Sequence, residues 1–262
     1  MSMLRGSRVL FRNGSLFLAV LVFSSMALSS CAFKEKETDS LSRFEVQELY
    51  QRGSAKYQNG YYMEAEDFFK KIVESYPLSN EAALAQLALA DIYYATEEYE
   101  DAASYYTTFY SFHPAHPKAH YALFQKGMSH FKGVVGVDRD QTETRKALFT
   151  FEDFIAGYPD SMYIEKALEL KVFLRRRLAD SELYVGRYYF KRKNYKGALL
   201  RLADILAKYP EVGLTDKVLY YIGESYGHLG EDELAKDAYN TLLSEYPKSP
   251  FVGFAQRKLA EG

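Results

Sequence analysis

The apolar positions of this chain recur at spacings that predict paired helices. Five segments carry an alanine, an aromatic residue or leucine four positions later, and a proline twelve positions after the alanine. They are Ala65/Phe69/Pro77, Ala102/Tyr106/Pro114, Ala147/Phe151/Pro159, Ala198/Leu202/Pro210 and Ala235/Tyr239/Pro247. Residues four apart share one face of a helix, and proline ends a helix because it lacks a backbone N–H. Each segment therefore predicts a helix with a buried face and a fixed end.

A small residue precedes each alanine and predicts a partner helix. In four copies it lies twelve positions earlier, at Gly53, Ala90, Gly186 and Gly223, and in the third copy Gly127 lies twenty positions earlier. Small residues at a crossing let two antiparallel helices approach closely. The eight extra residues of the third copy predict an insertion between its two helices. Successive prolines lie 37, 45, 51 and 37 residues apart, and the longest interval predicts one long helix near residues 163–193.

This periodicity resembles the tetratricopeptide repeat (TPR), a helical hairpin that stacks on its neighbours. The fifth copy matches the TPR spacing throughout, at Gly223, Tyr226, Ala235, Tyr239 and Pro247. We predict an all-α fold for residues 44–262. It consists of a TPR-like superhelix of five helical hairpins with a C-terminal capping helix.

Residues 1–30 predict a lipoprotein signal peptide. A basic region without acidic residues is followed by an apolar run over residues 16–28 and then by Leu28-Ser29-Ser30-Cys31. The basic residues are Arg5, Arg8 and Arg12. The run is shorter than a membrane span of about 20 residues, so it indicates a cleaved signal. Small residues before the chain's single cysteine resemble the lipobox of bacterial lipoproteins, in which that cysteine is acylated. The alternative is ordinary signal cleavage beside a free thiol at Cys31.

Residues 31–43 form the predicted tether, lipidated at Cys31 and flexible because it is rich in charged and polar residues. The membrane partner would be reached through the N-terminal lipid, since several acyl chains hold a protein firmly. Alanine at position 32 fits sorting to the outer membrane, by analogy with enterobacterial lipoproteins. Without the signal the chain has 30 basic and 35 acidic residues, a balance of −5. This charge argues against binding nucleic acid by electrostatics alone.

Three motifs suggest catalysis or metal binding, and each has a simpler structural interpretation. Residues 223–227, Gly-Glu-Ser-Tyr-Gly, fit the serine-hydrolase pattern, but they fall inside a predicted helix instead of a strand-to-helix turn. His113, His116 and His120 are separated by prolines, which predict a turn. Residues 138–140, Asp-Arg-Asp, lack the glycine and terminal glutamate of a calcium loop. We predict no catalytic residue, no metal and no cofactor.

An aromatic row follows the small residue by four positions in four of the copies. Its members are Tyr57, Tyr94, Phe131 and Phe190. In the TPR register this position points toward the concave groove, but helical spacing alone leaves groove and core equally open. Exposed rings of this kind would suit extended or hairpin peptide segments.

A basic region accompanies the long predicted helix on a chain that is acidic overall. Residues 175–177, all arginine, are expected late in this helix, and further cations follow at Arg187, Lys191, Arg192, Lys193 and Lys196. One interpretation is a solvated helix face with cations placed favourably near the helix C-terminus. The other is a docking surface for an acidic partner, whose approach such charges would steer.

Several of these features together resemble the BamD family, the lipoproteins of the outer-membrane β-barrel assembly machinery (BAM). They are the lipobox, the five repeats, the insertion at residues 134–140, and the strings Val172-Phe173-Leu174 and Arg177-Leu178-Ala179 in the long helix. The resemblance runs from about Phe44 to Leu259. The insertion is shorter here than in the enterobacterial members.

The resemblance implies a non-enzymatic protein, lipid-anchored on the periplasmic face of the cell outer membrane. Members of the family bind the POTRA region of the barrel protein BamA through C-terminal repeats, associate with accessory BAM lipoproteins, and receive unfolded outer-membrane proteins through N-terminal repeats. Arg201 matches by position an arginine implicated in BamA coupling, and Arg187 and Arg177 are further candidates on this side. The client groove would involve four residues by repeat register: Tyr50, Tyr57, Asp91 and Tyr94.

Two other functions stay open on the sequence. A TPR lipoprotein that coordinates peptidoglycan synthesis or cell division would share the signal and the repeats but need not carry the insertion. A hydrolase acting through Ser225 would need the serine to project from a sharp turn.

Overall fold

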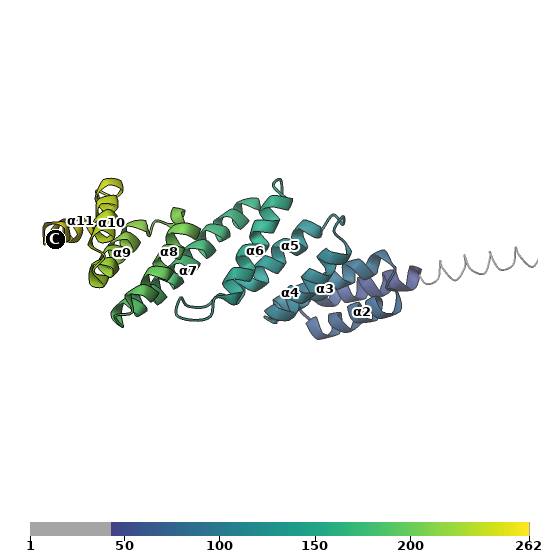
Figure 1. The fold of residues 1–262 in the computed structure, drawn as a ribbon. Helices are drawn as coiled ribbons and strands as arrows, with labels where there is room; N and C mark the ends of the chain where they lie inside the picture. Colours follow the sequence, from purple (N-terminus) through teal and green to yellow (C-terminus); the bar gives the residue numbers. More distant parts are fainter. Residues whose placement is uncertain (1–42, 262) are drawn as a thin grey trace, which may run out of the picture. The chain divides into compact units, whose positions relative to one another are not determined.

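The computed structural model describes residues 43–261, and all regular structure within that range is helical (Figure 1). No β-strand occurs between residues 43 and 261. The predicted signal peptide, the lipidation residue Cys31 and all but the last residue of the tether lie outside the described residues. The described chain divides into two compact units between Ala85 and Gln86.

The first unit contains the first predicted hairpin. A helix over residues 43–58 is followed by α2 (Tyr62–Ser75), and the turn between them contains Gly60 at a φ of +77°, a left-handed conformation that glycine adopts without strain. Ala65, Phe69 and Ile72 are buried on α2. A Cβ atom built on Gly53 would lie 3.0 Å from Phe69 Cε1, so the small residue makes room for the ring.

The second unit begins within α3 and continues to the end of the described chain. Its elements are α3 (Asn80–Ala95, of which residues 86–95 belong here), α4 (Tyr99–Phe112), α5 (Ala119–Lys132), α6 (Thr142–Gly157), α7 (Ile164–Lys191), α8 (Tyr195–Lys208), the 3-10 turn η1 (Pro210–Val212), α9 (Thr215–Leu229), α10 (Asp232–Glu245) and α11 (Val252–Glu261). From α4 to α11 each helix packs on the next one along the chain (Figure 1). The predicted all-α, TPR-like sequence of hairpins and its C-terminal helix are thus confirmed.

The prolines define where the second helix of each hairpin stops. Helices α2, α4, α6, α8 and α10 all end two residues before the proline of their repeat. In each case the residue before the proline leaves helical geometry, as Tyr209 does with a ψ of 45° before Pro210. This agrees with the steric restriction that proline imposes on its predecessor.

The core of each hairpin lies where its two helices cross closely. Ala147 and Ala198 are fully buried. A Cβ atom built on Gly223 would lie 2.5 Å from Tyr239 Cε1, and one on Gly186 would lie 3.2 Å from Leu202 Cδ2. The glycine therefore faces the side chain four residues after the repeat alanine, and the two helices meet closely because no larger residue stands there.

Two departures from regular repeat length were predicted and are confirmed. Helix α7 has 28 residues, twice the length of α8. The insertion forms the loop between α5 and α6, and two side chains bond to backbone carbonyls near its middle. Gln141 Nε2 donates to the carbonyl oxygen of Gly136 at 2.8 Å, and Ser181 Oγ on α7 donates to that of Val137 at 2.8 Å. The loop is thereby attached to the middle of the long helix.

Candidate functional site: partner-binding surfaces

The three consecutive arginines lie in the middle of α7, so the prediction that they sit late in the helix was wrong. They are too far from its C-terminus to interact with the helix dipole. Arg175 forms an ion pair with Glu211 and donates to the carbonyl oxygen of Lys208 at 2.6 Å. Arg176 donates to the carbonyl oxygen of Val212 at 2.6 Å and to Asp180 at 3.1 Å. We call Arg175 and Arg176 the arginine clamp, because they hold the connection between α8 and α9 against α7.

The electrostatics of the clamp are those of a satisfied ion pair. The hydrogen bond to Glu211 raises the pKa of Arg175, and the same bond holds the pKa of Glu211 below its usual range. The Arg175 guanidinium also lies 5.3 Å from the centre of the Tyr209 ring. Its hydrogen-bonding capacity is therefore used within the fold.

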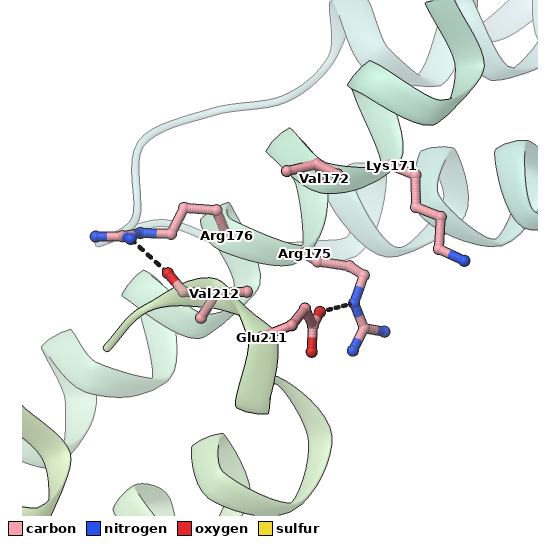
Figure 2. A pocket seen from close by; sticks show the side chains of 6 residues that line it. All are labelled: Lys171, Val172, Arg175, Arg176, Glu211 and Val212. Carbon is pink, nitrogen blue, oxygen red and sulfur yellow. Dashed lines mark hydrogen bonds and ion pairs between the residues drawn. The ribbon is translucent and has the colours of Figure 1, made fainter. Parts of the chain in front are cut away.

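Beside the clamp lies a cleft of about 590 Å³. Its lining comprises Lys171, Val172, Arg175, Arg176, Glu211 and Val212 (Figure 2). Figure 2 shows Arg176 reaching the Val212 carbonyl and Arg175 turned toward Glu211. Val172 is 69% exposed at its edge. The lining contains no serine, cysteine or histidine, and its charged groups are those of Lys171, the two clamp arginines and Glu211.

The three arginines predicted for the BamA side fall into two places. Gly186 lies next to Arg187, and a Cβ atom built on Gly186 would lie 3.5 Å from Arg201 Cβ, which places both arginines at the crossing of α7 and α8. Arg177 lies ten residues before Arg187, about 15 Å along the helix axis. The structure therefore places Arg187 and Arg201 on adjacent helices near one crossing and leaves Arg177 apart.

Their immediate contacts also differ. Arg201 pairs with Glu182 of α7 at 3.2 Å. The Arg177 guanidinium lies 5.4 Å from the centre of the Phe173 ring, and that of Arg187 lies 5.8 Å from the centre of the Tyr221 ring. Neither Arg177 nor Arg187 forms an ion pair with another residue between 43 and 261. Partner binding by all three stays a prediction.

Two tyrosines of this region were not singled out from the sequence. Tyr184 and Tyr188 lie on the last turns of α7 and are 50% and 52% exposed. Together with Arg187 and Lys191 they line a hollow of about 180 Å³. The i, i+3, i+4, i+7 spacing of the four residues was available as a signal, but the adjacent tyrosine and phenylalanine residues of this segment obscured it.

The four predicted client-groove residues lie in two units. Tyr50 and Tyr57 share the helix over residues 43–58, and the Tyr50 ring centre lies 5.7 Å from that of Phe69. Asp91 and Tyr94 share α3. Their role in client binding stays a prediction.

Asp91 has a structural role in the second unit. Its Oδ1 accepts hydrogen bonds from the hydroxyls of Tyr106 at 2.5 Å and Tyr121 at 2.8 Å. Burial raises the pKa of the Asp91 carboxyl, while the two tyrosine hydrogen bonds act in the opposite direction. Burial also raises the pKa of both tyrosines. Asp91 thus joins α3, α4 and α5.

The aromatic row is half-buried, intermediate between the two alternatives left open by the sequence. Tyr57, Tyr94, Phe131 and Phe190 all have intermediate exposure. Three of them contact the ring five residues later, across the turn of their own hairpin, in the pairs Tyr57–Tyr62, Tyr94–Tyr99 and Phe190–Tyr195. The ring centres in these pairs are 5.5 to 5.6 Å apart. The row therefore packs against the hairpin turns while part of each residue stays accessible.

The alternative hydrolase motif has the wrong geometry for a nucleophile. Ser225 lies inside α9 and is fully buried, and its hydroxyl donates to the carbonyl oxygen of Tyr221 at 2.7 Å. A nucleophile elbow needs a strand-to-helix turn and an exposed hydroxyl. His113 and His116 pack against the Phe109 ring. Within residues 43–261, no group of three or more His, Cys, Asp or Glu side chains is placed to hold a metal ion.

No helix in the described part of the chain has both the length and the apolar character needed to cross a membrane.

Comparison with known proteins gives relatives over most of the chain. BamD of Caulobacter vibrioides, named outer membrane protein assembly factor, is 30% identical over 243 residues, which are 92% of this chain and 79% of the relative. The protein of the same name from Rickettsia prowazekii is 28% identical over 241 residues, which are 92% of this chain and 95% of the relative. A TPR protein structure from Parabacteroides merdae has 17% identity and a TM-score of 0.41, covering 82% of this chain and 75% of that one.

A family model described as YfiO, outer membrane lipoprotein, matches residues 43–242. This range covers the described part of the first unit, most of the second, and every described residue predicted to bind a partner. The chain therefore belongs to the YfiO family of outer membrane lipoproteins, in which its curated relatives carry the name BamD.

Proposed function

We propose that this chain is a non-enzymatic scaffold that binds the POTRA region of a BamA-type barrel protein and receives unfolded outer-membrane proteins. It would act on the periplasmic face of the outer membrane, held there by lipid on Cys31, beside accessory BAM lipoproteins. The observation that carries the proposal is the placement of Arg187 and Arg201 on adjacent helices at one close crossing. The relatives' name, outer membrane protein assembly factor, supports the same role.

The proposed chemistry is recognition without bond making. Arg187 forms no ion pair within residues 43–261, so it can meet a partner carboxylate without first breaking one. Arg201 pairs with Glu182 at 3.2 Å, so it would either leave Glu182 for a partner carboxylate or bind both carboxylates at once. Energy for barrel assembly would come from folding of the client in the bilayer.

Affinity purification of the native lipidated protein from membranes tests this function. Wild type is expected to retain a BamA-type barrel protein, and Arg201→Glu is expected to retain at least tenfold less, because like charges would face each other at the interface. Lys71→Glu on α2 makes the same charge change at an exposed residue of the first hairpin and serves as control. Glu182→Gln removes the internal pair while keeping Arg201. Recovery of cell-wall enzymes alone would contradict the proposal and favour the peptidoglycan alternative.

The lipid tether has its own test. Cys31→Ser is expected to leave the helical hairpins folded and to release the protein from membranes, since acyl chains supply about 0.8 kcal/mol per buried CH₂. Circular dichroism and fractionation after carbonate washing measure the two effects. Firm retention of the variant in the outer-membrane fraction would contradict lipid anchoring at this residue.

A further inference from the structure

The last two turns of α7 present an exposed face of alternating tyrosines and cations. Tyr184, Arg187, Tyr188 and Lys191 are spaced i, i+3, i+4 and i+7, so they lie on one side of the helix. The two tyrosines are about half exposed, and the four residues surround a hollow of about 180 Å³. We call this set the Tyr–cation face.

This face lies in the part of the chain with the strongest local positive charge. Residues 183–203 contain six lysines and arginines and no aspartate or glutamate, although the whole chain has a net charge of −2. Neither Arg187 nor Lys191 forms an ion pair with another residue between 43 and 261. Their charges are therefore left for solvent or a partner, in contrast to those of the arginine clamp.

One ring of this face, Tyr188, and one of its cations, Arg187, already form ring–cation contacts. The Arg192 guanidinium lies 5.6 Å from the centre of the Tyr188 ring, and that of Arg187 lies 5.8 Å from the centre of the Tyr221 ring. Such contacts restrict long arginine side chains before binding, which lowers the entropy lost in a complex. Tyrosine and arginine are also the residues that most often dominate binding energy at protein interfaces.

We propose that the Tyr–cation face binds an acidic segment of a partner polypeptide. Carboxylates of the segment pair with Arg187 and Lys191, and its apolar side chains pack on Tyr184 and Tyr188. The choice of an acidic occupant follows from charge complementarity with residues 183–203. A polypeptide fits better than a lipid surface because the four residues enclose a hollow, whereas a bilayer is engaged by projecting apolar side chains. The inference rests on the proposed scaffold function and names the chemistry of one partner surface.

Fluorescence anisotropy with the lipidated full chain in detergent tests this directly. The probes are a labelled synthetic peptide rich in glutamate and leucine and the same peptide with lysine in place of glutamate. The glutamate peptide is expected to bind at least tenfold more tightly than the lysine peptide. Arg187→Glu with Lys191→Glu should weaken it at least tenfold, and Tyr184→Ser with Tyr188→Ser about fivefold at unchanged charge.

A matched control uses another cation that lies over a ring. Arg257 lies 4.7 Å from the centre of the Phe254 ring, and both Arg257 and Lys248 are exposed. Arg257→Glu with Lys248→Glu is expected to change affinity less than twofold. All variants replace exposed residues, so unchanged thermal melting confirms that they are folded.

Four results would overturn the inference. An unchanged affinity in the double tyrosine variant would mean that the peptide binds by unspecific charge attraction alone. An equal loss in the control variant would mean the same. Binding of anionic phospholipid vesicles that depends on this face, without binding of the glutamate peptide, would assign it to the membrane. If the peptide fails to bind while the native protein still retains a BamA-type barrel protein, this inference alone fails and the proposed function stands.

Discussion

The middle and the end of α7 both carry exposed or partly exposed cations, yet these cations make different contacts. In the middle, Arg175 and Arg176 donate to backbone carbonyls of the connection between α8 and α9 and pair with Glu211 and Asp180. At the end, Arg187 has no ion pair between residues 43 and 261. Cations whose hydrogen bonds are satisfied internally stabilise the fold, whereas unpaired exposed cations are available for binding. Cations of the same helix can therefore have two roles, stabilising the fold in the middle of α7 and binding a partner at its end.

The largest change in stability is expected at the crossing where α8 packs against the end of α7. Ala198→Phe places a ring at a fully buried crossing with α7 and should destabilise the protein by about 1 to 3 kcal/mol or more. Urea denaturation measures it. An unchanged midpoint would mean that the crossing is not tightly packed, and the end of α7 would then need another source of stability.

A smaller effect is expected for the clamp. Arg175→Ala with Arg176→Ala removes two charged hydrogen bonds to carbonyl oxygens and should cost about 1 to 2 kcal/mol, a value reduced for partial exposure. Affinity for the glutamate peptide should stay within twofold. Loss of peptide binding with no loss of stability would reverse the roles assigned to the two regions.

Replacing the cations at the end of α7 should leave stability nearly unchanged, in contrast to the clamp variant. Arg187→Glu with Lys191→Glu is expected to change the free energy of unfolding by less than about 0.5 kcal/mol, because both residues are exposed and unpaired. The same denaturation experiment measures this. A loss comparable to that of the clamp variant would show that these cations stabilise the fold.

The smallest effect concerns pH. Arg175 lowers the pKa of Glu211 below the ordinary value of 4.5. The stability from this pair is therefore present above about pH 4.5 and is lost as pH falls through the folded-state pKa. Arg175→Gln should flatten this part of the stability profile, whereas Arg187→Gln should leave it unchanged. Parallel profiles for wild type and Arg175→Gln would contradict the assignment.

The sequence predicted what depends on local spacing. Pro210 determines the end of α8, and the match of Gly223 with Tyr239 follows from helical periodicity. The clamp could not be predicted, because Arg175 and Arg176 reach carbonyls 33 and 36 residues away. Spacing alone also failed to distinguish the exposed Tyr188 from its half-buried neighbour Tyr189, since both belong to one aromatic run.

The hydrogen bonds of Asp91 were likewise not predictable from sequence spacing. Repeat register placed it in a client groove, but its carboxylate accepts from hydroxyls 15 and 30 residues further along the chain. A register position specifies a helix face and does not specify which hydrogen bonds the residue makes there. Those bonds depend on how α4 and α5 pack beside α3.

The most direct measurement compares partners retained by three lipidated proteins purified from membranes: wild type, the clamp variant and the variant with Arg187→Glu and Lys191→Glu. We predict that the variant with Arg187→Glu and Lys191→Glu, called the end variant, remains folded but retains at least tenfold less of its barrel-assembly partners than wild type. The clamp variant should keep these partners under conditions where it remains folded. Full retention of partners by a folded end variant would contradict the claim that the unpaired cations of α7 form a binding surface.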